Sequence, residues 1–296
     1  MKEGFLIGGG LIIAGMLLEL SVGGVDWDAF AWPANGIVMA LFLAIIISLF
    51  LFRKKVYAFR FISTYQAAIP VLAYAVVLTT IMGLTRQTVD GTWLNNMLTF
   101  WPFVLIYVYM AVILGLVILK QIQAEINKIR HFHSFRQLFT GFPFSLLSHL
   151  GLFLAMTTAT LGNADMERLK MITVVGEPEW RALTKENAIR ELPLAIELKQ
   201  FIMETYDDGS PKRFASEIQI LTKSGKNIHT TVDVNNPFEV DGWKIYQYGY
   251  DTQLGPMSQT SILELVSDPW LPYVYTGIYL MLAGAILMFV KGGVKG

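Results

Sequence analysis

Four histidines are the side chains of this sequence that could ligate a metal or carry a proton near neutral pH, and His149 lies inside an apolar segment. It is seven residues into the stretch FPFSLLSHLGLFLAMTTATLG, residues 142–162. If this stretch spans a membrane, a rise of ~1.5 Å per residue places the imidazole about 10 Å below the cytoplasmic surface. An ionisable group at such a depth is energetically costly and usually functional. His149 is therefore the first candidate site residue.

Three roles are open to an imidazole in this position. It could bridge two helices through a hydrogen bond, with Ser145, Ser148 or another neighbour as the partner. It could relay protons. It could also donate one axial ligand to haem iron, for which neutral imidazole is well suited, with the second ligand coming from elsewhere.

The remaining sequence offers little other reactive chemistry. His131 and His133 lie among basic residues of a predicted loop and His229 lies in a predicted strand, so all three are interpreted as solvated. The absence of cysteine excludes disulfides, thiolate metal sites and covalent haem attachment to this chain. We find no phosphate-binding glycine loop, no H-E-x-x-H and no nucleophile elbow, and we assign no catalytic residue. A formal net charge of zero does not indicate a nucleic-acid partner.

The composition predicts an α-helical integral membrane protein that holds these groups in a lipid bilayer. Hydrophobic residues make up 54% and charged residues 16% of the chain, and the mean hydropathy is +0.49. Crossing the hydrocarbon core takes about 20 apolar residues. Six segments qualify, and the first is interpreted as a retained span rather than a signal peptide. The predicted spans are residues 5–22, 34–52, 65–84, 97–119, 142–162 and 271–290.

The distribution of Lys and Arg predicts the orientation of these spans. Basic residues gather at both termini and after the second and fourth spans, whereas the opposite short loops carry Asp26, Asp28, Asp90 and a single Arg86. We therefore expect both termini to be cytoplasmic, in the cell inner membrane, with residues 163–270 outside, in the periplasm.

Three further polar segments have structural interpretations. Glu19, near the outer end of the first span, is expected to reach the membrane interface. Gln66 and Pro70 lie in the first turns of the third span, where proline is tolerated. Residues 120–139 have isoleucines at helical spacing, which indicates either an amphipathic helix on the membrane surface or an extension of the fourth span.

Residues 163–270 predict a small, mostly antiparallel external β-domain. Strand-like runs flank a Ser-Gly turn at 224–225, and Asp241-Gly242 lies between alternating apolar residues, which is a strong hairpin signal. The predicted organisation is a five-span membrane region at 1–162, the β-domain at 163–270, and a final span with a cytoplasmic tail at 271–296. The hairpins of this domain contain no group of side chains arranged for catalysis. This favours a role in binding or docking over a role as an enzyme.

Two blocks of the sequence resemble the ResB (CcsB) family of System II cytochrome c biogenesis. One is SHLGLFLAMTTATLGNADMERLKM at 148–171, and the other is VDVNNPFEVDGWKIYQYGYD at 232–251, followed by the last span. The resemblance implies a factor that acts with a CcsA-type membrane subunit, handles haem b and delivers it to apocytochrome c. It also implies a haem-ligating histidine within the membrane, for which His149 is the candidate.

The resemblance implies a non-catalytic subunit of a haem-lyase complex, because the tryptophan-rich haem-handling motif of the partner does not occur in this chain. Two other functions stay open. The chain could be a transporter or channel subunit, although few charged residues lie in its spans and its halves show no repeat. It could also be a membrane-anchored sensor whose external β-domain binds a ligand.

Overall fold

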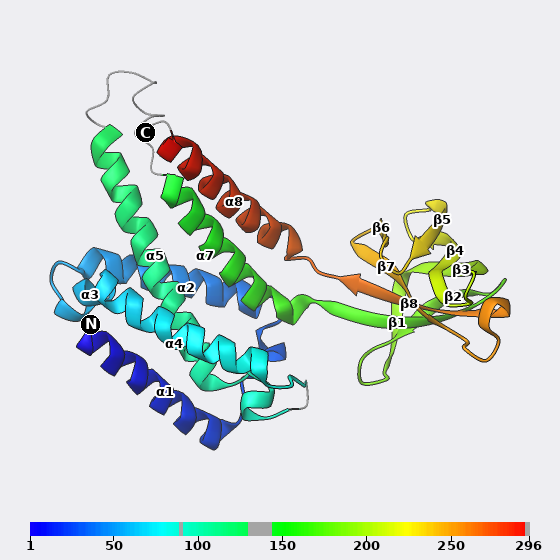
Figure 1. Ribbon diagram of the computed structural model, residues 1–296, viewed down its shortest axis with the longest axis horizontal. Coiled ribbons are helices and arrows are strands. Elements are labelled where there is room, and N and C mark those ends of the chain that lie inside the picture. Colours follow the sequence, from blue (N-terminus) through cyan, green and yellow to red (C-terminus); the bar gives the residue numbers. More distant parts are fainter. Residues whose placement is uncertain (89–90, 130–143, 294–296) are drawn as a thin grey trace. The chain divides into compact units, whose positions relative to one another are not determined.

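The computed structural model describes residues 1–88, 91–129 and 144–293 of the chain (Figure 1). The chain divides into two compact units. The helical unit comprises Met1–Ala164 and Trp270–Gly296, and the sheet unit comprises Asp165–Pro269. The positions of His131 and His133 lie outside the described residues.

Six helices in the described part of the first unit are long and apolar enough to cross a membrane, which confirms the predicted number of spans. Short helical turns lie in the connections between them. The six are α1 (Lys2–Val22), α2 (Ala34–Phe52), α4 (Tyr65–Leu84), α5 (Trp101–Ile129), α7 (Phe144–Gly162) and α8 (Leu271–Gly293), and the short elements are α3 (Tyr57–Ile62), η1 (Asp28–Phe30), η2 (Trp93–Asn95) and η3 (Asn163–Asp165).

Helix α5 is longer than expected and begins later. It starts at Trp101 rather than near residue 97 and continues without a break to Ile129. Residues 120–129 are therefore an extension of the fourth span, and not a separate helix on the membrane surface. The rest of that predicted helix, residues 130–139, lies outside the described residues.

The side chain of Glu19 bonds to the first residue of α5. The prediction that this side chain reaches the membrane interface is therefore wrong. Glu19 of α1 is only 8% exposed, and its Oε2 accepts a hydrogen bond of 3.1 Å from the backbone N–H of Trp101. The indole Nε1 of Trp101 in turn donates to the carbonyl of Gly23 at 2.9 Å. A carboxylate at a helix N-terminus satisfies a free N–H and interacts favourably with the helix dipole. Glu19 is thus a capping group supplied by a neighbouring helix.

Helices α7 and α8 pack closely along their lengths, and small residues on both helices make this possible (Figure 1). A Cβ atom added at Gly277 of α8 would lie 2.5 Å from the backbone nitrogen of Ala155, and one at Gly284 would lie 2.6 Å from that of Ser148. On α7, a Cβ at Gly151 would meet the backbone of Gly277 and Met281. Without side chains at these points, the two backbones approach closely enough to gain van der Waals contact in lipid.

The sheet unit is one eight-stranded sheet in the order β5-β4-β3-β2-β1-β8-β7-β6, whose paired strands are antiparallel, as predicted. Its first and last strands are neighbours in the middle of the sheet and pair from Glu167↔Ser267 to Val174↔Thr260. The strands are β1 (Glu167–Val174), β2 (Pro178–Leu183), β3 (Ile189–Thr205), β4 (Pro211–Thr222), β5 (Asn227–Asp233), β6 (Phe238–Val240), β7 (Trp243–Tyr250) and β8 (Thr260–Ser267).

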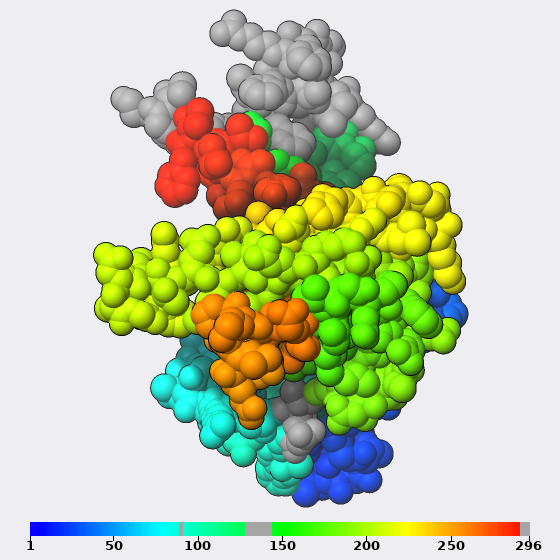
Figure 2. All heavy atoms as spheres, turned by 90° about the vertical axis from the view of Figure 1, so that its right-hand side faces the viewer, coloured from blue at the N-terminus to red at the C-terminus, as the bar shows by residue number. Residues whose placement is uncertain are grey.

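Alternation of apolar and polar residues directs one face of this sheet inward. The strand β3 shows the pattern most clearly, with Leu192, Leu194, Ile196 and Leu198 all buried in one hydrophobic core. The predicted Asp-Gly hairpin joins β6 to β7, with φ of 47° at Asp241 and 84° at Gly242, and positive φ at both positions is typical of a type I′ turn. The segment between β7 and β8, which contains η4 (Gly255–Met257), projects from the surface of the unit (orange in Figure 2).

A buried polar cluster joins four strands inside the sheet unit. Gln247 of β7 accepts hydrogen bonds through Oε1 from Ser216 of β4 (2.5 Å) and Ser261 of β8 (2.9 Å), while its Nε2 donates to the carbonyl of Gly249 (2.7 Å). Thr173 of β1 donates to the carbonyl of Ser261 at 2.9 Å. All four side chains are at most 3% exposed. Buried polar groups are stable only when bonded, so this cluster fixes how the strands meet.

Candidate functional site

The candidate site centres on His149, which lies in the second turn of α7 and is half-buried. Its Nδ1 is 3.1 Å from the amide Oε1 of Gln121 on α5. The amide Nε2 of Gln121 reaches 3.4 Å to the hydroxyl of Ser145, one turn before the histidine on α7. The extension of α5 beyond the predicted span end at residue 119 is what brings Gln121 to this position. The structure thus joins α5 and α7 through a short polar chain.

The contact with Gln121 favours one tautomer of the neutral ring. An amide oxygen only accepts hydrogen bonds, so in this tautomer Nδ1 carries the proton and the Nε2 lone pair is available. Among the described residues, none bonds to Nε2. The imidazole therefore bridges two helices and still offers one nitrogen.

The predicted partners of His149 have different roles. Ser145 reaches Gln121 rather than the ring, and the hydroxyl of Ser148 donates to the carbonyl of Met281 on α8 at 3.2 Å. Helix bridging takes place, but through Gln121, which belongs to the stretch interpreted from sequence as interfacial or as a helical extension.

The contacts of His149 are compatible with this side chain serving as one axial ligand to haem iron. Metal-bound imidazoles commonly donate their other N–H to a carbonyl or carboxylate, which orients the ring and raises its basicity. Gln121 provides that second contact. The described part of the helical unit contains no other histidine, and the described residues form no cluster of three metal-binding side chains. His149 could hold one side of an iron, and the other ligand would have to come from outside these residues.

Two adjoining cavities lie between the helices at the other end of α7. Their volumes are about 230 and 380 Å³, and both are open over part of their wall. His149 lines neither, and it lies seven residues before Met156, the first residue of α7 in both walls. The residues common to both are Trp27, Val104, Tyr107, Val108, Met156 and Thr160.

Besides Gln121, two other polar residues of the helical unit were not singled out as site residues from the sequence. Asn35, at the start of α2, is fully buried; its Nδ2 donates to the carbonyl of Leu161 near the end of α7 at 3.3 Å, and its Oδ1 accepts from the N–H of Gly36 at 2.8 Å. Lys120 of α5 donates through Nζ to the carbonyl of Ser63 at 2.7 Å, after α3. An amide at the start of an apolar span is the signal that could have identified Asn35, because polar groups in lipid hydrogen-bond across helices.

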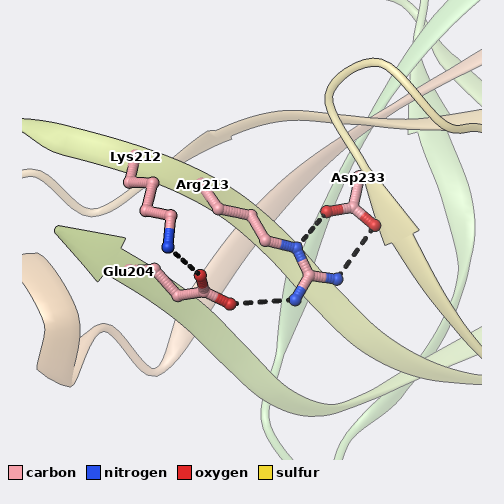
Figure 3. A network of polar contacts seen from close by, with 4 residues as sticks. All are labelled: Glu204, Lys212, Arg213 and Asp233. Carbon is pink, nitrogen blue, oxygen red and sulfur yellow. Dashed lines mark hydrogen bonds and ion pairs between the residues drawn. The ribbon is translucent and has the colours of Figure 1, made fainter. Parts of the chain in front are cut away.

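A network of charged side chains in the sheet unit surrounds Arg213 of β4 (Figure 3). The guanidinium donates to both carboxylate oxygens of Asp233 at 2.6 and 3.1 Å and to Glu204 at 3.0 Å, while Lys212 lies 3.8 Å from Glu204. The hydrogen bonds to Asp233, and then to Glu204, raise the pKa of Arg213. The network ties β3, β4 and β5 together at one edge of the sheet.

His229 of β5 is 57% exposed, as its interpretation as a solvated strand residue requires. Its Nε2 lies 3.4 Å from Glu217 of the neighbouring strand. An exposed pair of this kind contributes little to stability. Among the described histidines, only His149 is placed within a helix that could span the membrane.

Comparison with known proteins finds similarity to the family that residues 148–171 and 232–251 resemble. Residues 144–262 match the ResB-like family, a segment that begins with α7, includes His149 and ends within β8. "Cytochrome c biogenesis protein CcsB" of Prochlorococcus marinus subsp. pastoris is 27% identical over 140 residues, which is 47% of this chain and 32% of that protein. The protein of the same name from Prochlorococcus marinus strain NATL1A is 28% identical over 102 residues, 34% of this chain and 23% of that protein.

The chain thus spans a third or less of the length of these curated relatives. A solved structure of "Cytochrome c Heme Lyase CcmF" aligns with 86% of this chain and 45% of that chain at 14% identity, with a TM-score of 0.35. A similarity at this level carries no argument about fold or function.

Proposed function

We propose that this chain, similar to the ResB/CcsB proteins, acts in cytochrome c biogenesis as a subunit that handles haem b together with a CcsA-type membrane partner and delivers it to apocytochrome c. The observation that supports the proposal most is the ResB-like match, because it covers α7 with His149. The partial coverage of the relatives makes every statement about substrate and partner part of this proposal.

The proposed arrangement in the cell follows from the loop charges. Both termini lie in the cytoplasm, the helices cross the inner membrane, and residues 163–270 lie outside, where apocytochrome c is found. The basic residues 53–55 follow α2, whereas α7 leads through η3 into the sheet unit. In this arrangement His149 lies in the cytoplasmic half of the bilayer, and the sheet unit serves as a docking platform for the partner or the apocytochrome.

His149 is proposed to donate its Nε2 to the haem iron as one axial ligand. Haem would supply a flat, largely apolar ring whose iron takes up to two axial ligands. Gln121 is a positioning residue, since its Oε1 accepts from Nδ1 and directs Nε2 away from α5. A single nitrogen ligand from this chain leaves the second to the CcsA-type partner, so that the haem is shared between two subunits.

The test is the absorption spectrum of the complex purified with a CcsA-type partner, in wild-type form and as His149→Ala. The proposal expects a Soret band that falls about tenfold in the variant and returns when imidazole is added to the buffer, because a small ligand can replace the lost side chain. Ser148→Ala is the matched control, since Ser148 is adjacent but bonds to α8. It should leave the band unchanged.

A second variant separates ligation from packing. Gln121→Ala removes the hydrogen bond to Nδ1 but keeps the imidazole, so haem should stay bound with a shifted reduction potential or a shifted reduced spectrum. If His149→Ala retains its full haem content, the ligand assignment is wrong. If the wild-type complex has no Soret band, the haem-handling function itself is refuted.

A further inference from the structure

We propose that the two adjoining cavities of the helical unit bind one membrane phospholipid, with an acyl chain in the smaller cavity and the ester region of the lipid at the larger one. This inference is independent of haem ligation at His149, which lines neither cavity.

The smaller cavity has a wall that is almost entirely carbon. Its two indoles direct their N–H groups to backbone carbonyls, Trp27 to Leu98 at 2.9 Å and Trp101 to Gly23 at 2.9 Å. Their ring surfaces therefore present only carbon to the space between the helices. A polar ligand placed here would lose its bonds to water and find no partner in return.

The threonines of this wall are satisfied in the same way. Thr157 donates to the carbonyl of Phe153 and Thr160 to that of Met156, each at 2.8 Å and each within α7. Hydroxyls bonded to the preceding turn have no free proton for a ligand. The cavity thus selects for hydrocarbon, and its volume of about 230 Å³ exceeds the ~150 Å³ of an apolar cavity that takes up benzene.

The larger cavity continues from the smaller and has a more polar wall. Asn163, the first residue of η3, lines it and not the smaller cavity, whereas Tyr107 of α5 lines both. An apolar cavity that leads to a more polar one matches an amphiphile. Its apolar acyl chain would occupy the smaller cavity, and its polar ester region would lie at the larger one.

The surroundings identify the amphiphile. The wall residues belong to membrane-spanning helices or to the connections and short 3₁₀ turns at their ends, on the side where α7 leads into the sheet unit, and both cavities are partly open. Phospholipid is the most abundant amphiphile of a bilayer, and an open cavity in contact with it would otherwise leave its wall without packing partners.

Val108 provides the variant that tests the site. It lines both cavities and is 45% exposed, so Val108→Trp fills the opening without replacing a core residue. Val76→Trp is the matched control, because Val76 is 65% exposed on α4 and lines neither cavity.

The experiment uses the full chain, reconstituted in phosphatidylcholine vesicles with brominated acyl chains, extracted in mild detergent and examined by native mass spectrometry. We expect one tightly held brominated phospholipid per chain, its retention reduced about tenfold in Val108→Trp and unchanged in Val76→Trp. Bromine should also quench indole fluorescence of the extracted protein in the wild type and less in Val108→Trp.

Three outcomes would overturn the proposal. These are equal retention in the two tryptophan variants, loss of the lipid at the same collision energy as loosely bound detergent, and a quinone or porphyrin mass that takes the place of the phospholipid. The Soret band of the complex with its partner reports separately on the haem proposal, so failure of one inference leaves the other intact.

Discussion

Replacing Gly277 with alanine should weaken the packing of α7 against α8. The distances around the added Cβ atom give the approximate loss of stability. The added Cβ would lie 2.5 Å from the backbone nitrogen and 2.9 Å from the Cα of Ala155. Ordinary contact begins at about 3.4 Å, so the helices must separate locally by about 1 Å. Neither neighbouring atom belongs to a side chain that could rotate away. Overpacking of this kind destabilises by roughly 1–3 kcal/mol.

The assay is reversible unfolding of the full chain in mixed micelles, followed by circular dichroism as the denaturing detergent fraction rises. Gly10→Ala is the matched control, because a Cβ at Gly10 of α1 meets nothing within 4 Å. Alanine there should be neutral or stabilise by up to about 1 kcal/mol through helix propensity. If Gly277→Ala and Gly10→Ala unfold at the same midpoint, the close approach of α7 and α8 does not contribute as argued.

Three other perturbations have defined outcomes. Glu19→Ala should lower the free energy of unfolding of the full chain by roughly 0.5–2 kcal/mol, since the N–H of Trp101 loses its acceptor, and chemical denaturation against Ser21→Ala measures this. Gln247→Ala should destabilise the sheet unit by about 1–3 kcal/mol, because two buried hydroxyls lose a shared acceptor and their contact with each other satisfies only one of the two protons, as hydrogen exchange of β4 and β8 amides would report. Hydrogen bonding from Arg181 lowers the pKa of Glu179 below its ordinary 4.5. The stability that this carboxylate contributes is present above pH 4.5 and is lost as pH falls through the lower folded-state value, so Glu179→Gln should flatten the pH dependence of unfolding in that acid range.

Each of these expectations has a result that contradicts it. An unfolding midpoint of Glu19→Ala equal to that of Ser21→Ala would show that water replaces the cap. Unchanged exchange in β4 and β8 of Gln247→Ala would mean that the two serines find other partners. A pH profile of Glu179→Gln that coincides with the wild type would show that the exposed contact to Arg181 has no weight.

The helical spans and hairpins could be predicted because their signals are local. The ends of α2 and α4 follow from runs of apolar residues, and the β6–β7 turn follows from Asp241-Gly242, whose positive φ few other pairs adopt. Strand β2 was not predicted. Most of its residues are exposed and a bulge interrupts its pairing between Glu179 and Arg181, so no alternation marks it in the sequence.

The candidate site was predicted only in part, because its partners depend on contacts between helices. His149 stands out as an imidazole in an apolar run. Gln121 is 28 residues away in sequence. The isoleucine spacing of residues 120–139 allowed an extension of the fourth span, but it does not show that the extension brings Gln121 beside the ring. Glu19 was assigned to the membrane interface and Asn35 was not singled out for the same reason, since each bonds to the backbone of a helix distant in sequence. Polar side chains within spans are better interpreted as forming hydrogen bonds to another helix than as reaching the aqueous interface.

The pairing of β1 with β8 makes the sheet unit an excisable module. Its two ends leave the middle of the sheet as adjacent strands, and within the helical unit Gly162 and Trp270, where the chain departs and returns, are in contact. Topologically, residues 165–269 are an insertion into an αα-hairpin formed by α7 and α8. A short loop of a few glycines could connect α7 directly to α8. The sheet unit could therefore be removed or exchanged without changing the order or direction of any transmembrane helix.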